Sequence, residues 1–150
     1  MPRRELKKPR RSEMPPDEGK KPRLPSGTDL WPQQSFRWRV NDNYIDMEHE
    51  EWGWGDLPIN EFFDILKNSL QKYEDMSWHD LLNRSSCHPM PLHKIERRAR
   101  ERLRARFPDI DTLHQVDFSE LGRVWGVKKG QYFQLVWHDP YHTVYPTRRR

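Results

Sequence analysis

Three segments of the chain place apolar residues at helical spacing. In residues 59–73, apolar residues recur at i, i+3, i+4, i+7, i+11 and i+14, which predicts one buried helix face made of Ile59, Phe62, Phe63, Leu66, Leu70 and Tyr73. Asp56 is the expected N-cap of this helix, with Pro58 in its first turn. Ser77 and Asp80 have the spacing of a capping box, which predicts a second, short helix that ends near residues 85–86.

The third helical pattern extends from Leu92 to Arg106, and Pro108 ends it. Its buried stripe consists of Leu92, Ile95, Ala99, Leu103 and Phe107. Between the second and third helices, Pro89 and Pro91 predict an extended linker over residues 87–93.

Beyond residue 111 the apolar period changes to two, which predicts three strands, over residues 114–118, 123–127 and 132–137. A tight turn over residues 128–130 joins the last two, and the last is so apolar that we expect it inside the sheet. Further short strands are expected over residues 36–40 and 143–145. The predicted fold class is α+β, with two to three helices packed on one face of a small antiparallel C-terminal sheet.

The positive charge of the chain is concentrated at its start. The 150 residues carry a formal net charge of +4. Residues 1–29 hold nine basic and five acidic residues, so the remainder is neutral. Residues 1–32 also contain seven of the 13 prolines and almost no large apolar residue, which predicts a disordered basic tail over 1–32 and a single α+β domain over 33–147. The basic pairs of the tail either contact phosphates or form a solvated tail.

Two blocks of opposite charge lie inside the predicted domain. Residues 42–64 contain eight acidic residues and no Lys or Arg, and they include Trp52 and Trp54, which we expect at the domain edge. Residues 94–106 contain seven basic residues and two acidic ones. Arginines on the free face of this helix can follow a phosphate backbone, and the candidates are Arg97, Arg100 and Arg104. The alternative is that the two blocks attract each other within the fold or between subunits.

Several function classes are excluded by the sequence. The chain has no run of about 18 apolar residues, so we expect no membrane span. The basic N-terminal residues are not followed by the apolar segment of a signal peptide, which favours a cytoplasmic protein over a secreted one. Cys87 is the single cysteine and cannot form an internal disulfide. The histidine spacings lack a zinc motif, so neither a metal nor a small-molecule cofactor is expected.

The best candidate site lies in the C-terminal hairpin and the residues after it. A span of 23 residues holds Arg123, Lys128, Lys129, His138, Asp139, His142 and Tyr145. Neighbouring strands lie about 4.8 Å apart, so several of these side chains can share one patch. A His or Tyr can move the protons in RNA cleavage without a metal, while Arg or Lys stabilises the charge on phosphate. The alternative is a hairpin with ordinary polar edges.

The motifs in this part of the chain resemble a small bacterial family that brings no activity with it. The resemblance covers about residues 50–146 and is carried by Met76-Ser-Trp78, His88-Pro-Met-Pro91, Arg123-Val-Trp-Gly126, Phe133 to Trp137, Asp139-Pro140, His142 and Val144-Tyr-Pro146. More distantly, helices followed by a hairpin are similar to the RelE/ParE-like toxin fold. That resemblance implies a strand arginine, Arg123, and a terminal His/Tyr pair, His142 and Tyr145, which are adjacent in the toxins and separated by two residues here.

Two functional hypotheses follow. The first is a RelE-like toxin that cleaves or binds RNA, in which His142 or Tyr145 performs acid/base catalysis and Arg123 holds the phosphate. Lys128 and Lys129 then add nucleic-acid contacts, and the candidate partners are RNA and an acidic, antitoxin-like protein. The second is a non-catalytic domain for protein–protein interaction, with exposed tryptophans, opposed charge blocks and a basic disordered tail.

Overall fold

A computed structural model describes residues 31–84 and 87–146 of the chain. The tail predicted over residues 1–32 lies outside these ranges except for its last two residues, where the short 3-10 helix η1 (Trp31–Gln33) begins. No helix in the described ranges is long and apolar enough to span a membrane.

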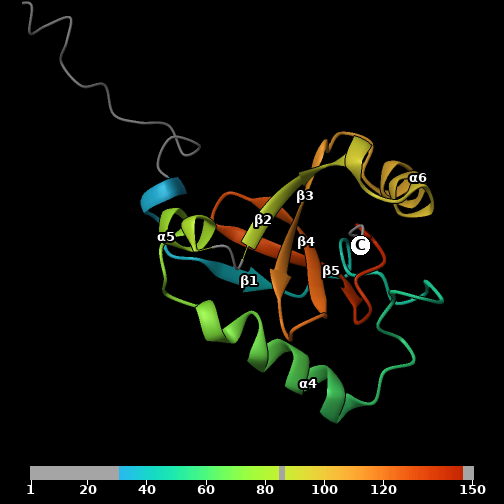
Figure 1. Cartoon of the computed structure of the whole chain (residues 1–150), viewed down its shortest axis with the longest axis horizontal. Coiled ribbons are helices and arrows are strands. Elements are labelled where there is room, and N and C mark those ends of the chain that lie inside the picture. The colour runs from blue at the N-terminus through green and yellow to red at the C-terminus, as the bar shows by residue number, and fades with distance from the viewer. Residues whose placement is uncertain (1–30, 85–86, 147–150) are drawn as a thin grey trace, which may run out of the picture. The chain divides into compact units, whose positions relative to one another are not determined.

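A five-stranded mixed sheet forms the centre of the fold (Figure 1). Its strands are β1 (Arg37–Arg39), β2 (Cys87–Pro91), β3 (Thr112–Asp117), β4 (Arg123–Lys129) and β5 (Tyr132–Asp139), in the order β1-β5-β4-β3-β2. The three predicted C-terminal strands and the short leading strand are confirmed, and so is the α+β class. The sheet is mixed rather than antiparallel because β1 pairs with β5 in parallel.

The segment predicted as an extended linker is the edge strand β2. It pairs with β3 over its whole length, from Cys87 opposite Val116 to Pro91 opposite Thr112. The backbone N–H of Leu92 continues this ladder to the carbonyl of Asp111 at 3.0 Å. Backbone N–H groups alternate in direction along a strand, so the two prolines occupy positions whose N–H would face away from β3, as expected on an edge strand.

The helices are α4 (Ile59–Asn68), η2 (Gln71–Tyr73), α5 (Trp78–Asn83), η3 (Leu92–Lys94) and α6 (Arg97–Arg106). Two predicted helices are interrupted: the one expected over residues 59–73 is divided into α4 and η2, and the one expected from Leu92 is α-helical only from Arg97. Ser77 caps α5 as predicted, because its Oγ accepts a hydrogen bond from the N–H of Asp80 at 3.0 Å. The N-cap of α4 is Pro58 rather than Asp56. Part of the expected apolar face of α4 is exposed, since Ile59 and Phe63 are 66% and 60% accessible.

The helices lie on both faces of the sheet, not on one face as predicted (Figure 1). One apolar cluster packs α4 and α5 against Val124 and Phe133, and the other packs α6 against Trp125 and Val127. Consecutive strand residues point to opposite faces, so Val124 and Trp125 belong to different clusters. A bulge places Val136 in β5 as an extra residue, because Trp125 pairs with Trp137 and Gly126 with Leu135.

The acidic and basic blocks pair with each other inside the fold. Asp46 is 2% exposed and accepts hydrogen bonds from Nε and Nη2 of Arg102 at 2.7 and 2.8 Å. Glu51 forms an ion pair with Arg98 at 2.7 Å. The interpretation that the two blocks attract within the fold is therefore confirmed. The expectation of tryptophans at the domain edge is wrong, because Trp52 and Trp54 are 0% and 3% exposed.

The segment predicted as a last short strand, residues 143–145, has no strand pairing. It folds back as a turn after β5, and the carboxylate of Asp139 accepts hydrogen bonds from the N–H groups of Thr143 and Val144 at 2.8 and 2.9 Å. The carbonyl of Val144 accepts a further hydrogen bond from the N–H of Glu96 at 2.7 Å. The end of the described chain is thus attached to the start of α6.

Candidate functional site

A pocket of about 460 Å³ opens on the same face of the sheet as α6. It collects residues from β2, η3, β3, β4 and the turn after β5. Its lining consists of His88, Pro89, Met90, Lys94, Gln115, Asp117, Arg123, His142 and Tyr145. All three predicted catalytic residues, Arg123, His142 and Tyr145, therefore line one cavity, although the first is distant in sequence from the other two.

The floor of the pocket consists of two cross-strand pairs. His88 lies opposite Gln115, and Asp117 lies opposite Arg123. Side chains of directly opposite residues project to the same face, and so do residues two apart on one strand. Gln115 also pairs with Trp125, whose ring belongs to the core cluster under α6. The four side chains of the floor therefore share the α6 face because of strand register alone.

One wall of the pocket is the turn after β5, which Asp139 holds in place. This carboxylate is 1% exposed and also accepts a hydrogen bond from Nε1 of Trp125 at 3.2 Å. The indole of Trp52 donates to Oγ1 of Thr143 at 2.9 Å. His142 in this turn has a φ of 61°. A non-glycine residue in this left-handed region stores about 1–3 kcal/mol of strain, which concentrates at functional sites.

The environment of His142 keeps its imidazole neutral. The ring is half-buried, and within the described ranges its Nε2 atom has no hydrogen-bond partner. Burial lowers the pKa of His142, and the positive charge of Arg123 lowers it further, against opposing effects of Asp139 and Asp117. The ring of Tyr145 stands edge-on to it, with centroids 6.5 Å apart. A neutral imidazole with a free nitrogen can accept a proton from a substrate.

Arg123 is held rigidly by the loop between β3 and β4. Its Nη1 donates to the carbonyl of Gly122 at 2.9 Å and, at longer range, to those of Ser119 and Glu120. Its Nε lies 3.1 Å from Oδ1 of Asp117 as an ion pair. Nη2 makes no hydrogen bond to any residue that the structure describes, so this end of the guanidinium is available to a phosphate oxygen.

Polar atoms without partners gather in this pocket. Among the described residues, eight buried side-chain nitrogen or oxygen atoms lack a hydrogen bond, and Oε1 of Gln115 and Nε2 of His142 are two of them in this pocket. A third, Oδ1 of Asp117, has Arg123 as its ion-pair partner. Gln115 is only 5% exposed, yet its Oε1 accepts no hydrogen bond. An unpaired buried polar atom costs about 1–3 kcal/mol, so a cluster of them indicates a site that a polar ligand completes.

The other predicted nucleic-acid contacts lie away from this pocket. Lys128 and Lys129 line a separate hollow of about 240 Å³. The ammonium group of Lys128 donates to the carbonyl of Gly130 at 2.8 Å and lies 5.0 Å from the ring of Trp78. Burial lowers the pKa of Lys128. The two lysines are therefore not part of the candidate catalytic site.

The predicted arginines of α6 differ in their freedom. Arg97 forms an ion pair with Glu101 at 3.8 Å, and Nη1 of Arg100 donates to the carbonyl of Ile95 at 3.0 Å. Arg104 is exposed and makes no ion pair within the described part of the chain. Of the three, Arg104 keeps its guanidinium most available to a phosphate.

Sequence reasoning missed four residues of the pocket: His88, Lys94, Gln115 and Asp117. His88 lies in the segment that its prolines predict as an extended linker, and this segment is the strand β2. Gln115 and Asp117 carry an available signal, since they alternate along a predicted strand and are therefore expected on one face. In the described ranges, no group of three or more His, Cys, Asp or Glu residues could hold a metal ion.

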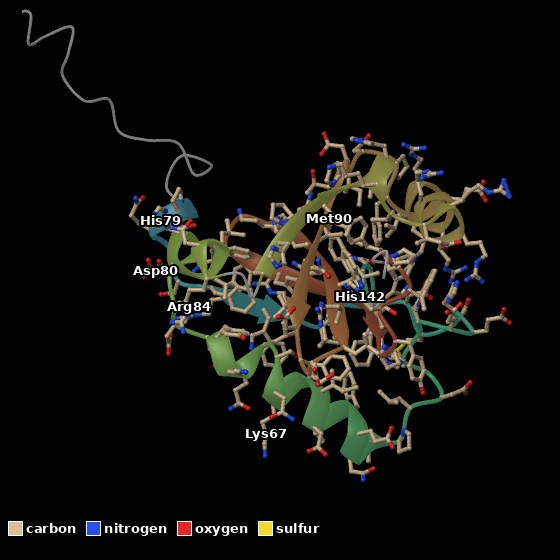
Figure 2. All side chains as sticks on the ribbon, in the orientation of Figure 1. Lys67, His79, Asp80, Arg84, Met90 and His142 are labelled. Atoms are coloured by element: carbon tan, nitrogen blue, oxygen red, sulfur yellow. The ribbon has the colours of Figure 1, made fainter. Side chains whose placement is uncertain are left out.

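Figure 2 places Met90 on β2 and His142 beyond β5, away from α5, which carries His79, Asp80 and Arg84. Comparisons with protein families, with curated proteins and with solved structures find no match to this chain.

Proposed function

We propose that this pocket binds single-stranded RNA and cleaves it without a metal ion, as a RelE-like endoribonuclease does. The observation that carries the proposal is the meeting of Arg123, His142 and Tyr145 in one cavity with unpaired buried polar atoms. The same cavity contains Lys94, a second cation. Two cations and an imidazole that is neutral near pH 7 are the groups that attack by a 2′-hydroxyl on phosphate requires.

Each group has a role in this proposal. The neutral ring of His142 takes the proton of the 2′-hydroxyl, and Tyr145 at its edge supports the proton transfers. Nη2 of Arg123 and the ammonium group of Lys94 stabilise the charge that develops on the phosphate. The backbone contacts of Arg123 hold its guanidinium in place before substrate binds, so little reorganisation is needed.

Flanking nucleotides have a path along the start of α6. Lys94 lines the pocket and is followed along the chain by Arg97 and then by the exposed Arg104. We assign these residues to phosphates outside the cleaved bond, with a weaker contribution from Arg100. Lys128 and Lys129 would contact RNA only if the strand passes the hairpin. An acidic protein that covers Lys94 and Arg123 would inhibit the enzyme in the cytoplasm.

The test is cleavage of a labelled single-stranded RNA with EDTA present. We expect cleavage by the wild type and a loss of about 100-fold or more in the H142A/Y145A double variant. Expression of the wild type in bacteria should arrest growth, whereas the double variant should not. An intact RNA together with normal growth would refute the proposal.

A second candidate function is a non-catalytic interaction domain, and one observation favours it. Ile59 and Phe63 lie one helical turn apart on α4 and are 66% and 60% exposed. Exposed apolar pairs of this size often belong to binding surfaces. The tryptophans first assigned to such a surface are buried, so α4 would have to carry it. If an I59S/F63S variant no longer arrests the growth of bacteria while the H142A/Y145A variant still does, this function is favoured.

A further inference from the structure

We infer that His88 is the general acid of the proposed cleavage and donates a proton to the leaving oxygen. The inference rests on the proposed function and adds a catalytic residue that the resemblance to toxins does not supply. Three features of the pocket support it: the position of His88, the lack of a hydrogen-bond partner for its ring among residues 31–84 and 87–146, and the shared location of His142 and Tyr145.

His88 is positioned by β2 at the edge of the pocket floor. It lies opposite Gln115 on β3. Two residues further along β3 is Asp117, which pairs with Arg123 of β4. The imidazole is half-buried, and none of the residues that the structure describes forms a hydrogen bond with it. Both ring nitrogens are therefore available to a substrate.

His88 borders the pocket on one side, and the turn after β5, which carries His142, borders it on another. β2 and β4 are separated by β3, so their backbones lie about 10 Å apart. His142 lines the same pocket as Arg123 of β4, from the turn that follows β5. A phosphate bound at Arg123 would therefore have His142 on one side and His88, reached from β2, on the other.

The chemistry requires groups on both sides. In an in-line displacement the attacking and leaving oxygens lie on opposite sides of phosphorus. His142 and Tyr145 pack against each other and so belong to the same wall. A phenol ordinarily titrates near pH 10 and an imidazolium near 6.5, so an imidazolium is the better acid at neutral pH. Tyr145 is then a positioning residue for the ring of His142.

The proposed step balances without another reactant. His142 removes the proton from the 2′-hydroxyl, and the 2′-oxygen forms a bond to phosphorus. The bond from phosphorus to the 5′-oxygen breaks, and protonated His88 gives its proton to that oxygen. The products are a 2′,3′-cyclic phosphate and a free 5′-hydroxyl. Exchange of protons with water returns His88 and His142 to their starting states.

A substrate with sulfur in place of the bridging 5′-oxygen tests this role. A thiolate leaves without protonation, because thiols ordinarily titrate near pH 8.5. We expect H88A to cleave ordinary RNA about 100-fold or more slowly than the wild type, and to cleave the sulfur substrate within about 10-fold of the wild-type rate. H142A should remain slow on both substrates.

The outcomes separate the inference from the function on which it rests. If the wild type cleaves neither RNA, both are refuted. If the wild type cleaves RNA and H88A does so at a similar rate, or if sulfur does not restore H88A, only the role of His88 is refuted. Cleavage of the sulfur substrate itself shows that H88A is folded. H79A is the matched control, because His79 is exposed on α5, away from His142 (Figure 2), and should have wild-type rates on both substrates.

Discussion

The carboxylate of Asp46 accepts two hydrogen bonds from the guanidinium of Arg102, at 2.7 and 2.8 Å, across 56 positions of sequence. Nε1 of Trp137 donates a third at 2.8 Å. Burial raises the pKa of Asp46, but the hydrogen bonds from Arg102 and Trp137 outweigh it and hold the pKa well below its ordinary value. This contact joins the segment before α4 to α6 and to β5.

We predict that D46N destabilises the protein by about 3 kcal/mol at pH 7, because it leaves the guanidinium of Arg102 without a charged partner. Urea denaturation measures this change. The contribution of Asp46 is present above the unfolded pKa of about 4 and is lost as the pH falls toward the folded pKa, so the difference between variant and wild type should shrink below pH 4. E51Q is the control, since its ion pair with Arg98 is exposed and contributes less than about 1 kcal/mol. Equal effects of the two variants would contradict the prediction.

His114 should make the fold sensitive to mild acid. It is 8% exposed, its Nδ1 has no partner among the described residues, and burial, together with the charge of Lys128, lowers its pKa to about 4. Between pH 6.5 and 4 the unfolded chain binds this proton and the folded chain does not, so stability should fall with pH by up to about 3 kcal/mol. H114L should weaken this dependence without loss of stability at pH 7. Thermal unfolding at several pH values measures both, and an unchanged pH dependence would refute the prediction.

Asp139 should be needed for activity through the turn that it holds. In D139N an amide nitrogen replaces one of the oxygens that accept the N–H groups of Thr143 and Val144, so the turn and His142 shift. We expect RNA cleavage to fall by about 10- to 100-fold, since misplacement by about 1 Å is enough for such a loss. The comparison is D80N on α5, which is exposed and should retain its activity. Full activity of D139N would show that the turn does not position His142.

The two glycines of the hairpin should tolerate substitution differently. A Cβ atom at Gly126 would lie 2.5 Å from the ring of Phe133 and 2.6 Å from the carbonyl oxygen of Gln134, which cannot move freely. G126A should therefore destabilise the fold by about 1–3 kcal/mol in urea denaturation. Gly130 has a φ of +62° and open space around it, so G130N should have a smaller effect, because Asn tolerates this conformation. A larger loss of stability in G130N than in G126A would contradict the described packing.

Local patterns predicted most of the helices and strands, and they placed Arg123, His142 and Tyr145 near enough to line one pocket. Period two after residue 111 was sufficient to place Arg123 on a strand next to the turn that carries His142 and Tyr145. The hydrophobic stripe predicted over residues 92–107 was mostly correct, since Leu92, Ile95, Ala99 and Leu103 are buried and Phe107 is half-buried. These features depend on residues close together in sequence, so the spacing of apolar residues is enough to predict them.

Contacts between segments that are distant in sequence could not be predicted from these local patterns. β1 has only three residues, and its pairing with β5 joins positions about 95 residues apart. Attraction between the acidic and basic blocks was predicted, but not that one carboxylate would be buried by an arginine more than 50 positions later. His88 was overlooked for a related reason, because only the pairing of β2 with β3 turns its side chain into the pocket.

The prolines of β2 also restrict how this protein can associate with others. β2 forms one edge of the sheet, and Pro89 and Pro91 lack the N–H groups that an added strand would need at those positions. The opposite edge, β1, is three residues long, too short for a stable ladder with another chain. Growth of the sheet by strand addition is therefore blocked at one side and weak at the other. A protein partner must recognise side chains, not the free backbone of a strand, and the same restriction protects the folded chain against edge-to-edge aggregation.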